Sequence, residues 1–82
     1  MYWIEKDNRL KATFKFTDFI QAFSFMTQVA IIAEKMNHHP TWSNTYDTVH
    51  FELSTHDEGN IVTMKDKLLA DHITQLYQRY LN

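Results

Sequence analysis

The sequence contains no cysteine, one glycine and one proline. Without cysteine the chain can form no disulfide, thiol nucleophile or cysteine zinc site, which is typical of a reducing compartment. With so little glycine and proline it has no room for a flexible linker or a glycine loop that cradles phosphate. It also has no apolar run of membrane-spanning length and no signal-peptide pattern, so we expect a cytoplasmic protein without membrane contact.

Neither sign of charge dominates, because the formal net charge is -2 and the lysine and arginine residues are scattered. Binding to nucleic acid or to an anionic membrane needs clustered positive charge, so the sequence predicts neither partner. The chain has 82 residues, of which 44% are hydrophobic, and we expect a single domain over residues 1–82. A domain of this size buries only about 60–65% of its unfolded surface, so its stability is marginal.

The first half of the chain predicts a hairpin followed by a helix. From Trp3 to Phe16 apolar and polar residues alternate beyond a turn at Asp7-Asn8. Thr17 is the expected N-cap of a helix. Its predicted core stripe has helical spacing and comprises Phe19, Ala22, Phe23, Met26, Ala30, Ala33 and Asn37. Other apolar residues, Ile20, Phe25, Ile31 and Ile32, lie around the rest of its circumference, so a second subunit is one candidate for covering them.

The second half repeats this order. Alternating residues predict two short strands or one bent strand between Trp42 and His56, and Asp57 to Asn60 form a loop. Thr63 and Asp66 have the spacing of a capping box, and the helix that follows is expected to reach about Leu81. Its core stripe is Met64, Leu68, Leu69, Ile73, Leu76, Tyr77 and Tyr80. The order β-β-α-β-β-α predicts a two-layer α+β fold, a four-stranded antiparallel sheet with both helices packed on one face.

Histidine is the residue type that points to chemistry. His38 and His39 stand together at the end of the first helix, directly before Pro40, and His56 lies in a second turn beside Ser54, Thr55 and Asp57. Imidazole titrates near neutrality, so these turns indicate general acid–base catalysis in a cleft between helix end and sheet. The alternatives are that His38 and His39 only cap the helix, and that His56 is a surface residue.

Other residues carry weaker signals. His50 and His72 are interpreted as surface histidines, and Asp66 as the capping-box acid rather than a catalyst. A histidine metal site is disfavoured, because no cysteine and no His-x-x-x-His pair on a helix is present. Trp42 could stack on a flat ligand, although an aromatic residue in a small domain more often belongs to the core.

At these residues the sequence resembles the pterin-4a-carbinolamine dehydratase family. The resemblance covers nearly the whole chain and rests on four segments: Phe14 to Phe19, Glu34 to Pro40 with Trp42, Asn44 and Tyr46, Leu53 to His56, and Thr63 to Asp66. The run Glu-x-x-x-His-His-Pro-x-Trp followed by Ser-Thr-His is its most specific part. The family commonly has a short helix before its first strand, whereas this sequence begins almost at that strand.

The resemblance implies a hydro-lyase that removes water from a 4a-hydroxytetrahydropterin, such as 4a-hydroxytetrahydrobiopterin, to give the quinonoid dihydropterin. No metal or organic cofactor is implied, and the step serves tetrahydropterin recycling. By position, His38, His39 and His56 match the three catalytic histidines of the family. The implied pterin contacts are these histidines with Asn37, Ser54, Thr55 and Asp57. A homodimer or homotetramer is expected, since the family assembles through sheet edges and helices.

A non-catalytic oligomeric module that binds a pterin or a protein on the same fold is the alternative. Retention of all three histidines argues against it, because a binding module has no need of three proton carriers.

Overall fold

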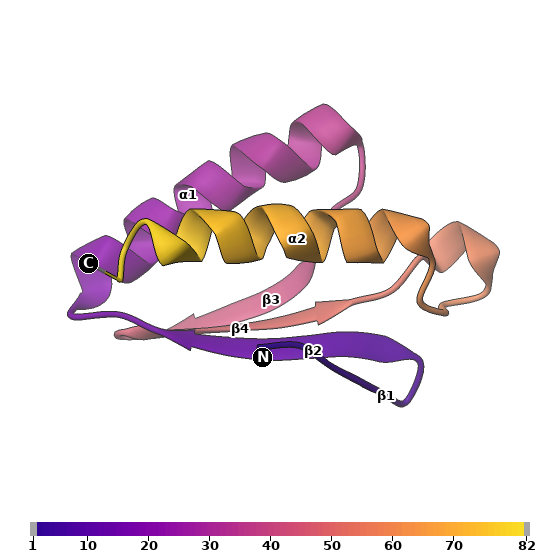
Figure 1. The fold of residues 1–82 in the computed structure, drawn as a ribbon, viewed down its shortest axis with the longest axis horizontal. Helices are drawn as coiled ribbons and strands as arrows, with labels where there is room; N and C mark the ends of the chain where they lie inside the picture. Colours follow the sequence, from indigo (N-terminus) through magenta and orange to yellow (C-terminus); the bar gives the residue numbers. More distant parts are fainter. Residues whose placement is uncertain (1, 82) are drawn as a thin grey trace.

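The computed structural model describes residues 2–81 and confirms the predicted element order and class. One antiparallel sheet forms the lower layer in Figure 1, and both helices cover its upper face. The elements are β1 (Ile4–Lys6), β2 (Arg9–Lys15), α1 (Phe19–Met36), β3 (Thr41–Thr45), β4 (Thr48–Leu53), a short 3₁₀ helix (His56–Glu58) and α2 (Met64–Gln78).

The strands are ordered β1-β2-β4-β3, so β4 lies between the strand that precedes α1 and the strand that follows it. Asp7 and Asn8 both have positive φ, 55° and 61°, as the predicted two-residue hairpin turn requires. In the two pairings made by β4, Leu10 of β2 lies opposite Leu53, and Thr41 of β3 lies opposite Glu52. This register places the segments that follow β4 and precede β3 side by side at one end of the sheet.

The core fills the space between the sheet and the two helices. Phe14 and Phe51 from the sheet pack against Phe25 from α1, with ring centroids 5.7 to 6.1 Å apart. Tyr77 of α2 packs on the ring of Phe14, and its hydroxyl donates a hydrogen bond to the Lys15 carbonyl at 2.8 Å. Aromatic side chains bury large areas, so this cluster provides much of the stability of a small domain.

The structure corrects the predicted buried face of α1. Its buried residues are Ala22, Phe25, Val29 and Ala33, whereas Phe19 and Phe23 are largely exposed. The helix is apolar around most of its circumference, so sequence spacing permits two overlapping stripes, and packing against β4 and α2 selects between them. The N-cap is also one residue later than predicted: the Asp18 carboxylate, not Thr17, accepts a hydrogen bond from the Gln21 amide at 2.9 Å.

Smaller corrections concern the second half of the chain. β4 ends at Leu53, and a 3₁₀ turn occupies residues 56–58, where the sequence predicted strand and loop. The capping box of α2 is confirmed, but the helix ends at Gln78, and Met64 and Leu68 of its predicted stripe are exposed. Within residues 2–81 no helix has the length and apolarity needed to cross a bilayer.

Candidate active site

A cavity of about 280 Å³ opens where α1, the end of β4 and the start of α2 meet. Its walls are formed by eight residues: Asn37, His38, His39, Ser54, Thr55, His56, Asp57 and Lys65. Seven of them are the residues that the sequence marked for catalysis or substrate binding; Lys65 is the addition. This volume is just below the roughly 300–1,000 Å³ of small-molecule sites, and it suits a ligand with one compact ring system.

The end of α1 determines how the histidine pair enters this cavity. Asn37 adopts the left-handed conformation (φ 53°, ψ 42°), and its backbone N–H bonds to the carbonyls of Ala33 and Glu34. This conformation ends the helix, and Pro40 two residues after His38 prevents its continuation. The chain therefore leaves α1 at a defined angle and carries His38 and His39 across the end of the sheet.

His38 occupies the centre of the site and is held by a buried carboxylate. Its Nε2 lies 2.6 Å from Oδ1 of Asp66, whose side chain has no exposed surface. The other oxygen, Oδ2, accepts hydrogen bonds from the Thr55 hydroxyl at 2.7 Å and the Thr63 amide at 2.9 Å. A carboxylate can only accept, so the His38 Nε2 carries a proton and Nδ1 is left for a ligand.

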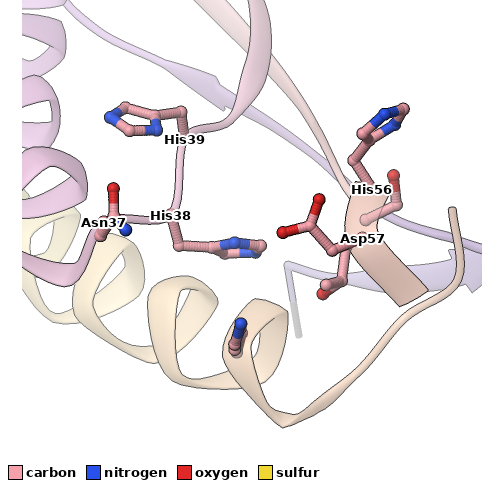
Figure 2. A pocket seen from close by; sticks show the side chains of 8 residues that line it. Asn37, His38, His39, His56 and Asp57 are labelled. Atoms are coloured by element: carbon pink, nitrogen blue, oxygen red, sulfur yellow. The ribbon is translucent and has the colours of Figure 1, made fainter. Parts of the chain in front are cut away.

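The other two histidines stand at the rim. The His39 Nε2 bonds to Oε1 of Glu34 at 2.8 Å, and Nδ1 of His56 bonds to the amide oxygen of Asn60 at 3.1 Å. Figure 2 shows the His39 ring turned toward α1, His56 on the opposite wall, and His38 and Asp57 pointing toward one another between them. In each of the three imidazoles an oxygen acceptor binds one nitrogen, and the second nitrogen remains available.

The remaining candidate residues lie elsewhere. Trp42 does not line the cavity; it is half-buried, and its ring packs on Phe51 with centroids 5.7 Å apart, as expected of an aromatic residue at the edge of the core. This follows from strand alternation, which directs Trp42 to the helix-covered face of the sheet. His50 lies on the open face and His72 is exposed on α2. Among residues 2–81, no three histidine, aspartate or glutamate side chains are grouped as metal ligands would be.

Sequence reasoning missed two features of the site. Lys65 carries no motif, and only the docking of α2 brings it to the cavity wall. Asp66 was recognised as the capping-box acid, but its contact with His38 joins residues 28 positions apart and has no sequence signature. The available signal was that the capping box itself lies a few residues after the histidine turn of Ser54 to Asp57.

Known proteins that are similar to this chain share one family description. A family model described as "Pterin 4 alpha carbinolamine dehydratase" matches residues 2–76. A protein of Prochlorococcus marinus (strain MIT 9515), named "Putative pterin-4-alpha-carbinolamine dehydratase", is 47% identical over 77 residues, 94% of this chain and 79% of the relative. A protein of the same name from strain MIT 9303 is 50% identical over 74 residues, 90% of this chain and 76% of the relative.

Two solved structures share the fold. One is a transcriptional coactivator/pterin dehydratase from Brucella melitensis, with a TM-score of 0.87 and 42% identity, covering 92% of this chain and 81% of its own. The other is a pterin dehydratase-like protein described as a RuBisCO assembly factor in the alpha-carboxysome, with a TM-score of 0.79 and 20% identity. It covers 94% of this chain and 90% of its own. At that identity it is evidence of a common fold alone.

Proposed function

The chain belongs to the pterin 4 alpha carbinolamine dehydratase family, and we propose that it dehydrates a 4a-hydroxytetrahydropterin by histidine acid–base catalysis. The product is the quinonoid dihydropterin, and the reaction would return pterin to the tetrahydropterin pool. The observation that carries the proposal is the set of three imidazoles around one cavity, each with one nitrogen bound by an oxygen acceptor.

The reaction needs two proton transfers and no change of oxidation state. An acid protonates the 4a-hydroxyl, the C4a–O bond breaks and water leaves, while a base removes a proton from a ring nitrogen of the pterin. Imidazole serves both steps near neutral pH. His38 is the central candidate because its Nε2–H is held by Asp66, which keeps Nδ1 directed to one place in the cavity. His39 and His56 are the candidates for the second transfer.

The surrounding residues fit a polar, flat ligand. Asn37, Ser54, Thr55 and Asp57 offer amide, hydroxyl and carboxylate groups at the wall, and these match the edge of a pterin, which presents both donors and acceptors. Of these, the Thr55 hydroxyl is already engaged with Asp66 and Thr63. The Thr55 backbone is engaged as well, because its N–H donates to the Ile61 carbonyl at 2.8 Å and its carbonyl accepts from the Asn60 amide at 3.0 Å. The polar contacts to the ligand are therefore expected from the side chains of Asn37, Ser54 and Asp57, with Thr55 forming the wall beside them.

The test is the dehydration rate of chemically prepared 4a-hydroxytetrahydropterin with wild type, His38→Ala, His39→Ala and His56→Ala. We expect at least one variant to lose about 10²-fold or more in kcat, the usual scale for a lost acid or base. His72→Ala is the matched control, since it removes an exposed imidazole outside the cavity. Activity should persist in the presence of a chelator.

The alternative function is a non-catalytic oligomeric module that binds a pterin or a protein. It draws on the alpha-carboxysome assembly factor, which has this fold. The same experiment separates the two, because a binding module would bind a pterin without accelerating its dehydration. A folded wild-type protein with no acceleration over the buffer rate would refute the dehydratase and leave the module.

A further inference from the structure

The register of the sheet places Arg9 beside the cavity wall. Neither the sequence nor the family relationship identified this charged residue. Arg9 begins β2, and the β2–β4 pairing that joins Leu10 to Leu53 sets Arg9 opposite Ser54 when continued by one residue. Arg9 and Ser54 therefore lie on the same face of the sheet, because directly paired residues share a face. The β3–β4 pairing ends at Thr41 and Glu52, so His39 lies beyond the paired residues, and its Nε2 bonds to Glu34 of α1.

The contacts of Arg9 agree with this placement. Its Nη1 donates a hydrogen bond to the Ser54 hydroxyl oxygen at 3.1 Å, and its Nε lies 3.5 Å from Oε1 of Glu52. Ser54 lines the cavity, whereas Arg9 and Glu52 do not. The guanidinium is therefore placed behind a wall residue, where it acts on the ligand only through Ser54.

Glu52 is itself held in place from the other side. The Nε2 of His50 lies 3.2 Å from Oε2 of Glu52, and the His50 Nδ1 accepts from the Thr13 hydroxyl at 2.9 Å. The pKa of Glu52 lies below its ordinary value, chiefly because of the His50 hydrogen bond and further because of the positive charges of Lys11 and Arg9. Glu52 is thus an anion at neutral pH and keeps the guanidinium oriented toward Ser54.

We propose that Arg9 is a positioning residue that turns the Ser54 hydroxyl into a hydrogen-bond donor toward an acceptor atom of the bound pterin. The inference deepens the proposed function and rests on it for the identity of the ligand. A hydroxyl has one proton and two lone pairs, and the guanidinium, which has donors only, takes a lone pair. The hydroxyl proton cannot point at the cation, so it points away from Arg9 and is available to an acceptor in the cavity that Ser54 lines. The partner there is a carbonyl oxygen or an unprotonated ring nitrogen.

The test compares Arg9→Met, Arg9→Lys, Ser54→Ala and the double variant Arg9→Met/Ser54→Ala. For Arg9→Met we expect KM for 4a-hydroxytetrahydropterin to rise about 3- to 10-fold, the range of one net hydrogen bond, with kcat nearly unchanged. Arg9→Lys should restore part of the loss. The double variant should match Ser54→Ala alone, because Arg9 acts through Ser54.

Lys15→Met is the matched control, because it removes the same charge from the same strand and face while contacting Asp47 rather than a cavity residue. Its KM should equal that of wild type. Binding of 7,8-dihydrobiopterin, measured by calorimetry, gives a readout that needs no turnover. If the wild type binds dihydrobiopterin without turning over substrate, and Arg9→Met binds it more weakly, the inference about Arg9 stands and the proposed dehydratase function fails.

Two results would overturn the inference while leaving the dehydratase intact. One is an active Arg9→Met protein with wild-type KM and wild-type affinity for dihydrobiopterin. The other is a double variant whose loss is the product of the two single losses, since that would mean Arg9 and Ser54 act independently.

Discussion

Asp66 has two functions that are usually carried by different residues. Its Oδ2 accepts the Thr63 amide and completes the capping box that begins α2, while its Oδ1 accepts the Nε2–H of His38. A buried carboxylate without partners is costly, but here both oxygens are hydrogen-bonded, and Thr55 supplies a further donor. One side chain therefore links helix initiation to the orientation of the proposed catalytic imidazole.

Asp66→Asn tests this link at the residue scale. An amide has one oxygen, so it cannot accept from both Thr63 and His38. We expect stability to fall by about 1–3 kcal/mol, the cost of an unsatisfied buried group, and dehydratase kcat to fall by about 10-fold or more, since the His38 proton is no longer held in place. Urea unfolding and steady-state kinetics measure the two effects separately.

Thr63→Ala provides the comparison for this prediction. It removes the hydroxyl that caps the Lys65 amide but leaves the Asp66–His38 contact. The cost to stability should be about 0.5–2 kcal/mol with kcat within about twofold of wild type. If both variants lose activity in proportion to stability, Asp66 has no role beyond folding.

At the scale of elements, the turn between α1 and β3 depends on the left-handed backbone of Asn37. Asn37→Gly retains this conformation without strain and removes the side chain, whereas Asn37→Ala removes the side chain and adds strain of about 1 kcal/mol. We expect the alanine variant to have the lower thermal midpoint. A similar rise in KM in both variants would identify an amide contact with the pterin. A KM unchanged in the glycine variant would limit Asn37 to its role in the turn.

The elements also show what sequence can and cannot predict. Periodicity of two and the Asp7-Asn8 turn sufficed for the first hairpin, and the spacing of Thr63 and Asp66 sufficed for the start of α2. For α1 the pattern did not predict the buried face, because apolar residues on several sides of the helix form more than one possible stripe. Only tertiary packing determines which stripe is buried. Seven of the eight cavity residues were found through their motif, and Lys65 was not. Asp66 and Arg9 join the site through contacts 28 and 45 residues apart in sequence.

At the scale of the whole molecule, α1 presents an apolar face away from the core. Ile20, Phe23 and Ile31 are 73%, 55% and 59% exposed, and they recur at helical spacing along one side. Exposed apolar area of this kind in a small protein marks an interaction surface. We therefore predict that the chain forms a dimer or tetramer in which this face is covered by a second copy.

Light scattering after size exclusion tests the assembly. Phe23→Asp should shift the protein toward the monomer, because burial of a charge without a partner is unfavourable. Leu68→Asp is the control, since Leu68 is an exposed apolar residue of α2. A monomeric wild type, or equal dissociation by both variants, would contradict an interface at α1.

The hydrogen bond between Asp66 of α2 and His38 has a consequence for how the protein loses activity. Three segments, the turn after α1, the end of β4 and the first turn of α2, share the buried carboxylate of Asp66. We therefore expect the site and the start of the helix to open in one cooperative step. On heating, turnover and helical signal should vanish at the same temperature. Selection that maintains catalysis in this chain would then also maintain its thermal stability.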